Sequence, residues 1–548
     1  MSEVEVSIDR LVRYCRARNV FLHPSVEAKK IQGRGLGVYS RERLELGERL
    51  VHVPTKEIFT TANIPNTFLD KSARVDLAVH AQLAAFLAFG GDALAEYEPW
   101  LSTWPAMEDF TDTMPMFWGE NIVEELQKLT NVTGSTNGSG ESKEHLVKRR
   151  KAETKSIVDG VDPFSSCNSE TKQPDLVDTP LLLPSALSEP IEASKDVNSS
   201  TGLVPQMVSK VAKHIGSISN ALPHLNLTCN HANLTRFLHA WCQVNTRCFY
   251  YILPTTSIRA IAGKRKQSVK TRVKPKPPSD PNEAMALCPF MDLFNHISPA
   301  TQSAVLSNSS SVALLPCEVE LSSTGFTIST KSTTQPDLEL LLSYGPHTND
   351  TLWTEYGFLL PGSTNSSDST PLDRIVLSDP RLNEQGIECL KEQGYLANYT
   401  LAVDGSACYR TEMAAWLLIL GPTEWIKVVE QGLDPEDVDL KHGEGHHNSD
   451  SGRSAKWEHN QVIMGWLTRL LRLAENSISK LATLSTDELL THFSTLSVVA
   501  SSQLFQSRDN DKLALARRRR NMCVVRWEQI KTMSEAGLAR AKEADIRE

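Results

Sequence analysis

Three features are missing from this sequence, and each absence excludes a class of protein. The first residues, MSEVEVSIDRLVRYCRARN, contain no apolar signal-peptide core, and no apolar run approaches the roughly 18 residues of a membrane-spanning helix. The 10 cysteines form no CxxC pair, which disfavours a disulfide framework and a zinc site. We therefore predict a soluble intracellular protein, cytoplasmic or nuclear or both, with reduced thiols, no bound metal and no membrane partner.

An excess of positive charge is also missing. The 57 Lys and Arg residues face 66 Asp and Glu residues, a net charge of −9, so nucleic acid is not an expected partner unless a local patch binds it. The basic run 264–276 reads as a solvated loop, with a nuclear localisation or RNA-facing segment as the alternative. The run ARRRR at 516–520 is on a periodic helix and is predicted to be a solvated face, and HGEGHH at 442–447 lacks helical metal-ligand spacing.

Patterning along the 548 residues predicts two or three domains of mixed character. Residues 31–54 alternate between glycine turns and short apolar segments, which predicts a small β unit closed by Pro54. The stretch 75–89 has the length and composition of a buried helix and ends at a Gly-Gly pair. A Ser-rich region over 303–330 resembles a hairpin.

Two further regions differ in composition or patterning from the rest of the chain. From about 131 to 223 the chain is rich in Ser, Thr, Asn, Gly and Pro, which predicts a largely disordered insertion with a possible helix near Val208–Ser219. Three apolar stretches beyond residue 380, beginning at Arg410, Gln461 and Leu513, have a period of 3.6 residues and predict a helical C-terminal third, about 380–540.

Four polar segments could carry chemistry: GRGLG at 33–37, NTR at 245–247, DLFNH at 292–296, and the stretch from SYG to YGF at 343–358. Each alone is weak. The glycines of GRGLG lack dinucleotide-binding spacing, so a tight turn is the alternative. A buried Asn-His pair such as Asn295 and His296 can be a satisfied hydrogen-bonding pair rather than a site.

Taken together and in this order, the four segments resemble the SET-domain protein methyltransferases, particularly the branch of the Rubisco large-subunit methyltransferase and the fungal ribosomal-protein and cytochrome c lysine methyltransferases. The resemblance covers roughly 20–120 and 232–361, and more weakly the helical third. It implies an α+β fold: a β-rich SET domain over 20–361, in which the Asn-His segment joins the SYG strand in a pseudoknot, followed by a helical substrate-binding domain over 380–540.

The resemblance also implies site residues and a cofactor, S-adenosylmethionine. Tyr344 is the expected catalytic residue beside the transferring methyl, and Tyr356 is expected to wall the lysine channel. Arg247 suits the cofactor carboxylate, or alternatively seals a helix surface. Plain core packing is the alternative for Tyr356 and Phe358. The expected cofactor-binding residues are Gly33, Arg34, Gly35, Arg247, Asp292, Asn295, His296, Asn349 and Phe358.

The expected function is methylation of a lysine on a non-histone protein, such as a ribosomal protein, by a monomeric enzyme. The post-SET cysteine cluster of many histone methyltransferases is absent, which disfavours histones. Two departures are visible: QPDLELL stands where the family often has Gly-Glu, and Thr348 stands where it has Ser. Methylation of a protein histidine, and a binding or scaffold role without turnover, are the alternatives.

Overall fold

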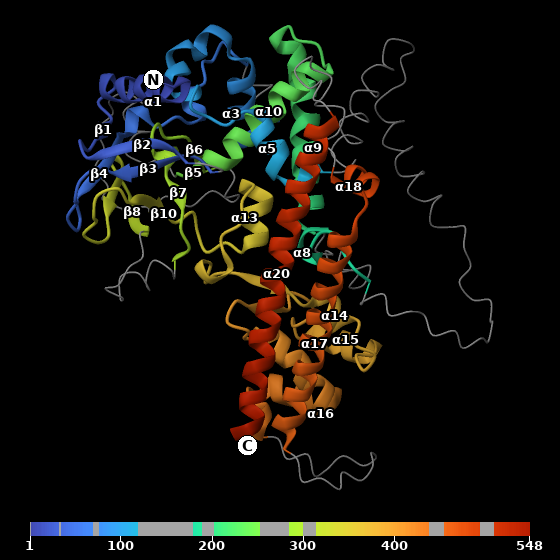
Figure 1. Cartoon of the computed structure of the whole chain (residues 1–548). Helices are drawn as coiled ribbons and strands as arrows, with labels where there is room; N and C mark the ends of the chain where they lie inside the picture. The colour runs from blue at the N-terminus through green and yellow to red at the C-terminus, as the bar shows by residue number, and fades with distance from the viewer. Residues whose placement is uncertain are drawn as a thin grey trace, which may run out of the picture.

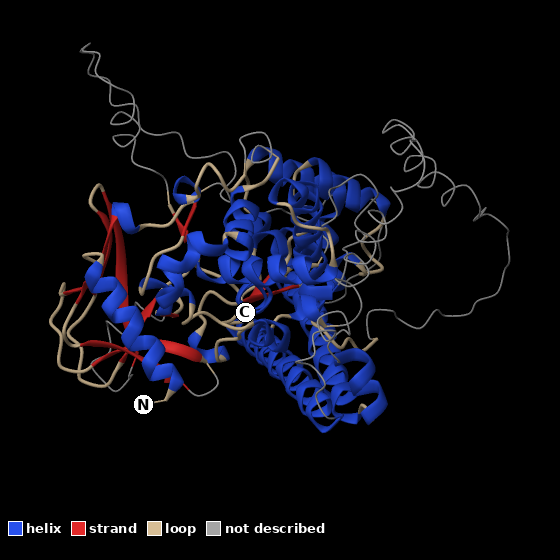
Figure 2. Ribbon diagram, turned by 90° about the horizontal axis from the view of Figure 1, so that it is seen from above, coloured by secondary structure: helices blue, strands red, loops and turns tan. Residues whose placement is uncertain are grey.

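The computed structural model describes residues 2–31, 34–69, 76–118, 179–188, 202–251, 284–299, 314–437, 454–493 and 509–547. Strands gather on one side of the molecule and helices on the other (Figures 1 and 2). This arrangement confirms the predicted α+β fold class with a helical C-terminal part. The boundaries predicted for the two domains stay predictions.

An eight-stranded sheet forms the strand-rich side. Its order is β1-β4-β9-β8-β10-β3-β2, with β7 paired to β10. The strands are β1 (Phe21–Leu22), β2 (Val26–Ile31), β3 (Gly35–Ser40), β4 (Arg49–Pro54), β7 (Asn295–His296), β8 (Leu314–Ser322), β9 (Gly325–Thr330) and β10 (Glu339–Leu342). The strands β3 and β4 confirm the β unit predicted for 31–54, and the β8–β9 pair confirms the hairpin-like region.

Segments far apart in sequence meet at the middle of this sheet. Strand β10 pairs with β3 on one side and with β8 on the other. Strand β7 runs parallel to β10, with Asn295 opposite Leu341 and His296 opposite Leu342. The pairing of the Asn-His segment with the SYG strand is therefore confirmed.

Helices α3 (Val79–Phe89), α9 (Leu203–Ala221) and α10 (His231–Arg247) pack beside the sheet (Figure 1). Helix α3 ends at Gly90, as the Gly-Gly pair predicted. Two buried hydrogen bonds join the three helices: His80 Nε2 lies 3.0 Å from the Trp241 carbonyl oxygen, and Trp241 Nε1 donates to His214 Nδ1 at 2.9 Å.

The helix predicted near Val208–Ser219, inside the insertion 131–223, is confirmed, and it is longer than predicted: α9 spans Leu203–Ala221. Helix α9 buries an apolar stripe at helical spacing, which includes Val204, Met207, Val211, Ile215 and Ile218. Short helix α8 (Ser185–Ser188) also packs against α9. Residues 131–178 and 189–201, like the basic run 264–276 and HGEGHH, lie outside the described residues.

Helices fill the C-terminal part, as predicted. They are α13 (Asn349–Tyr356), α14 (Asp373–Leu377), α15 (Glu384–Glu392), α16 (Tyr409–Gln431), α17 (Ala455–Thr483), α18 (Thr486–Phe493) and α20 (Asp509–Arg547), with the small β11–β12 sheet (Ser369–Pro371 and Thr400–Ala402) among them. Helix α16 is kinked at Gly421, which has φ +72° and precedes Pro422.

Helix α20 connects the two parts of the molecule. Its 39 residues extend about 60 Å, and it packs against α17, α18 and β12 as well as α5 (Met107–Thr113) (Figure 1). The prediction that ARRRR forms a solvated face is wrong for Arg519. This side chain is fully buried and donates to the carbonyl oxygens of Phe493 and Thr111.

Within the described ranges, no helix has the length and apolarity needed to cross a bilayer. The same ranges hold no group of three or more His, Cys, Asp and Glu side chains that could bind a metal ion.

Candidate active site

Tyr344 follows strand β10 and is bonded to the Asn-His segment at two points. Its hydroxyl donates to the backbone carbonyl oxygen of Phe294 at 2.6 Å, and its backbone N–H donates to Nδ1 of His296 at 3.0 Å. Burial raises the pKa of the Tyr344 hydroxyl well above its usual value. The hydroxyl is therefore protonated at neutral pH and acts as a donor of fixed direction, not as a base.

His296 is neutral at physiological pH. Burial, and secondarily the neighbouring His347, lower the pKa of its imidazole to about 4. Because Nδ1 accepts a hydrogen bond from Tyr344, the ring proton is on Nε2. The Nε2 atom is buried, and no hydrogen bond of good geometry reaches it among the described residues, although the Leu342 backbone interacts with the imidazole. A buried donor gains from a hydrogen-bond acceptor, so a ligand atom at this position would be stabilised.

Aromatic rings surround Tyr344. Tyr356 lies 5.3 Å from it between ring centroids, and Phe358 lies 6.2 Å from both Tyr356 and His296. Helix α13 ends at Tyr356, and Gly357 follows with φ +81°, a conformation that lets the chain turn so that Phe358 faces the same group. The structure thus brings Tyr344, Tyr356, Phe358 and His296 together as the sequence predicted.

The glycine turn lies beside this group, at the start of β3. Gly33 falls outside the described residues. Gly35 has φ +79°, and the space a Cβ would occupy there is open to 4 Å. Arg34 Nη2 pairs with a carboxylate oxygen of Glu339 at 2.5 Å. The Arg34–Glu339 pair therefore attaches the turn to β10, while the backbone at Gly35 stays accessible.

Asn295 fixes the turn to the Asn-His segment. Its Nδ2 donates to the Leu36 carbonyl oxygen at 3.2 Å and to Glu339 Oε1 at 2.8 Å. A Cβ on Gly37 would stand 2.9 Å from Asn295 Nδ2 and 2.4 Å from Ile31 Cδ1, so a larger residue there would displace these side chains. The close approach of β3 to Asn295 explains the third glycine of GRGLG.

Glu339 is a residue that the sequence reasoning missed. It is 4% exposed and joins Arg34 to Asn295, so it connects two predicted cofactor-binding segments. The stretch QPDLELL had been interpreted only as a departure from the family pattern. The signal was present, because Glu339 is the one charged residue within the apolar strand LELLL, and a buried carboxylate needs partners.

Arg247 and Asp292 bind each other. Arg247 Nη1 donates to Asp292 Oδ2 at 3.2 Å and to the Asp292 carbonyl oxygen at 2.9 Å, and Trp100 Nε1 donates to the same carboxylate. Burial raises the pKa of Asp292, and Arg247 opposes the rise. Arg247 thus uses Nη1 on the protein's own carboxylate, while its buried Nε has no hydrogen-bond partner among the described residues, so the sealing role and the cofactor role both stay predictions.

The segment that carries Asp292 and Asn295 begins with a strained residue. Phe290 has φ +69° although it is bulky, a conformation that costs about 1–3 kcal/mol, and its ring is 1% exposed. It leads into the turn Met291–Leu293, which directs Asp292 toward Arg247 and Asn295 toward the glycine turn.

Asn349 is the first residue of α13, and every hydrogen-bonding group of its side chain is used within the protein. Its Nδ2 donates to the Leu360 carbonyl oxygen and to Gln529 Oε1, and its Oδ1 accepts from the Leu360 N–H and from Asn365 Nδ2. The side chain is fully buried and has no hydrogen-bonding capacity left. In this structure the side chain of Asn349 holds the chain around α13, and the assignment of Asn349 to the cofactor stays a prediction.

Comparisons with known proteins identify similar chains. Ribosomal lysine N-methyltransferase set11 of Schizosaccharomyces pombe is 32% identical over 190 residues, which are 34% of this chain and 38% of the relative. SET domain-containing protein 4 of Mus musculus is 30% identical over 199 residues, 35% of this chain and 38% of the relative. The matched segments thus cover well under half of these relatives.

Among solved structures, the SET domain of LSMT bound to lysine and AdoHcy aligns with 99% of this chain and 92% of its own, at 13% identity and a TM-score of 0.47, a likeness too distant to carry an argument. No family model matches the chain. The sequence similarity to a ribosomal lysine methyltransferase and to SET domain-containing protein 4 confirms the resemblance to SET-domain lysine methyltransferases.

Proposed function

We propose that this chain is an S-adenosylmethionine-dependent protein-lysine N-methyltransferase. The observation that carries the proposal is the position of Tyr344, whose hydroxyl is fixed on the Phe294 carbonyl oxygen while its ring faces Tyr356 at 5.3 Å. Transfer of a methyl group to an amine is an in-line displacement, in which alignment contributes more than acid or base catalysis. A rigid hydroxyl beside an aromatic channel serves that purpose.

The residues beside the glycine turn fit the cofactor. A sulfonium compound with amino, carboxylate and adenine groups needs close backbone approach and a few polar partners in an otherwise apolar site. The open backbone at Gly35, the half-buried Asn295 and the buried Nε2 of His296 provide these, and Phe358 would line the adenine side. When bound, the cofactor supplies the methyl group.

The protein groups near the reaction are suited to an uncharged amine nucleophile. Desolvation among Tyr344, Tyr356 and Phe358 disfavours the ammonium form of an entering lysine. The Tyr344 oxygen retains lone pairs that can accept a hydrogen bond from the amine. His296 is uncharged, because its pKa is about 4, and so does not repel a cationic cofactor.

We propose further that the substrate is a lysine of a ribosomal protein. The support is the similarity to the fission yeast protein named a ribosomal lysine N-methyltransferase. The test is to incubate the purified chain with methyl-labelled S-adenosylmethionine and either purified ribosomal subunits or whole lysate, and to sequence labelled proteins by mass spectrometry.

Methyl-lysine on a ribosomal protein is the expected result. Label on a lysine of another protein would retain the activity and refute the substrate. Label on histidine would favour the alternative nucleophile. A folded chain that labels nothing, in subunits or lysate, would refute the enzyme and favour a scaffold.

A further inference from the structure

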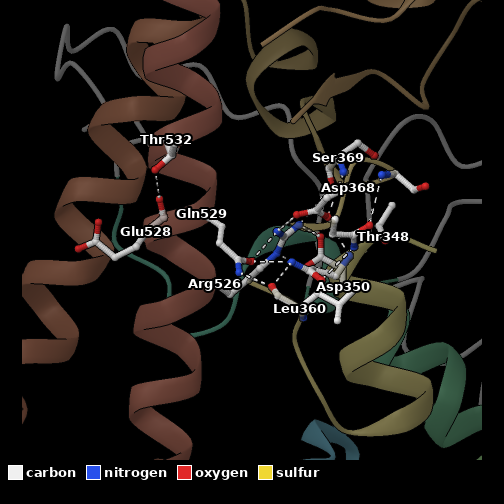
Figure 3. A network of polar contacts seen from close by, with 12 residues as sticks. Thr348, Asp350, Leu360, Asp368, Ser369, Arg526, Glu528, Gln529 and Thr532 are labelled. Carbon is white, nitrogen blue, oxygen red and sulfur yellow. Dashed lines mark hydrogen bonds and ion pairs between the residues drawn. The ribbon is translucent and has the colours of Figure 1, made fainter. Parts of the chain in front are cut away.

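Helix α20 closes a buried polar network at the start of α13 (Figure 3). Arg526 is fully buried, and its guanidinium donates through Nε and Nη2 to the two carboxylate oxygens of Asp350, each at 2.8 Å. Its Nη1 donates to Asp368 Oδ2 at 2.6 Å. One side chain of the C-terminal helix therefore binds carboxylates on α13 and on the turn before β11.

Gln529, one helical turn further along α20, extends the network to Asn349, the first residue of α13, and to Leu360, which follows the helix. Its Oε1 accepts from Asn349 Nδ2 at 2.9 Å and its Nε2 donates to the Leu360 carbonyl oxygen at 2.9 Å. Asn349 also accepts from the Leu360 N–H at 3.1 Å. The two ends of the segment 349–360 are thus held together, and Gln529 binds both.

This segment carries two walls of the aromatic site. Tyr356 is the last residue of α13 and Phe358 precedes Leu360 by two positions, while Tyr344 precedes Asn349 by five. Between Tyr344 and Asn349 the chain is stiffened, because His347 Nε2 lies 3.2 Å from the Tyr344 carbonyl oxygen and Thr348 caps α13. Tyr344 is also anchored to Phe294 and His296, whereas Tyr356 moves with α13. We therefore expect a shift of α13 to change the gap between the Tyr344 and Tyr356 rings.

We propose that Arg526 and Gln529 are positioning residues for methyl transfer, which set the width of the lysine channel from outside the SET core. The proposal rests on the proposed function. Displacements of about 1 Å at a reacting pair can cost on the order of a hundredfold in rate. The gap between the Tyr344 and Tyr356 rings also limits how many methyl groups the amine can carry while it still fits.

A contribution to stability alone would not require this arrangement. Buried ion pairs are often replaceable by apolar packing without loss of stability, because desolvation offsets their attraction. The same helix offers a matched control in Arg519, which is equally buried but donates to the carbonyl oxygens of Phe493 and Thr111 rather than to α13.

The experiment compares Arg526→Lys with Arg519→Lys in the full chain. The readouts are Tm, kcat, KM for S-adenosylmethionine, and the ratio of mono-, di- and trimethyl-lysine on ribosomal subunits, or on whichever lysate protein the wild type labels. Hydrogen exchange of the Leu360 amide reports on the network independently of activity. Gln529→Met serves as the second variant if Arg526→Lys does not fold.

We expect Arg526→Lys to lower kcat about tenfold or more and to change the methylation ratio, with KM for S-adenosylmethionine within about twofold. Leu360 should exchange faster. Arg519→Lys should lower Tm comparably and keep kcat and the ratio. Equal effects of the two variants would overturn the positioning role and leave the proposed function standing. An unchanged kcat and methylation ratio in folded Arg526→Lys or Gln529→Met would do the same. A wild type that transfers no methyl group would overturn the proposed function, and this inference with it.

Discussion

The hydroxyl of Tyr344 and the backbone carbonyl of Phe294 are 2.6 Å apart, although 50 residues separate them in sequence. The bond joins the strand that carries SYG to the segment that carries Asn295 and His296. It also directs the hydroxyl proton away from the aromatic gap, so the oxygen presents lone pairs rather than a donor to whatever enters.

Removing that hydroxyl tests the assignment of Tyr344. Tyr344→Phe keeps the ring and the backbone bond to His296, so folding and cofactor affinity should persist. Loss of a preorganised polar contact in a water-excluded site should slow methyl transfer by roughly 30- to 1,000-fold, or about 2–4 kcal/mol. Single-turnover kinetics with calorimetric titration of S-adenosylmethionine separate the two effects. Wild-type transfer in the variant would rule out Tyr344 as the catalytic residue.

Asn295→Ala should weaken binding of S-adenosylmethionine by about 1–3 kcal/mol, because it removes a polar partner and releases the Leu36 carbonyl oxygen at the glycine turn. Isothermal titration of the purified protein measures the change. Asn245→Ala is the matched control, since Asn245 donates to Glu355 and not to the turn. Equal affinities in wild type and folded Asn295→Ala would contradict a cofactor site at the turn.

Helix α9 should contribute to global stability. Ile215 is fully buried on its apolar stripe, so Ile215→Ala should lower the free energy of unfolding by about 2–5 kcal/mol. Urea denaturation followed by circular dichroism gives the value. Lys213→Ala, at an exposed position of the same helix, should change it by less than about 0.5 kcal/mol. A small effect of Ile215→Ala would mean that α9 is only loosely attached.

Stability should depend on the protonation of His296. Its folded pKa of about 4 lies below the unfolded value of 6.5, so between these values the unfolded chain binds more protons. The free energy of unfolding should therefore be highest above pH 6.5 and fall as pH decreases toward 4, by roughly 2–4 kcal/mol from this group.

Burial lowers the pKa of His80 and His459 as well, so the wild-type curve alone does not isolate His296. The measurement is the difference between wild type and His296→Gln in urea midpoints from pH 4 to pH 7. The variant should lose less stability on acidification. Parallel curves would show that His296 is not buried as a neutral ring.

The sequence was sufficient for features that are local or shared with a family. His296, Tyr344, Tyr356 and Phe358 were predicted to line one site, and their rings lie together because short motifs fix both the strands and the side chains. Arg247 and Asn349 were assigned to the cofactor on the same grounds. One guanidinium nitrogen of Arg247 binds Asp292, and the Asn349 side chain binds Leu360, Gln529 and Asn365, partners that no local pattern identifies.

Long-range partners were the main gap. Arg526 is 176 residues from Asp350 and 158 from Asp368. The sequence around either carboxylate therefore does not indicate that Arg526 is its partner. The helix itself did carry a signal. Arg519 and Arg526 fall on the same stripe as the buried Cys523, Trp527 and Ile530, and an arginine at a buried helical position must find a carboxylate or carbonyl partner.

The distance in sequence between Asp368 and Arg526 has a consequence for synthesis of the protein. At about 5–20 residues per second, the 158 intervening residues take roughly 8–30 s to translate. Until then Asp350 and Asp368 lack Arg526, their ion-pair partner among the described residues, and burying them unpaired would cost several kcal/mol per ion. We expect the emerging chain to keep the start of α13 hydrated, so the nascent SET core acquires its aromatic channel only after α20 has been made.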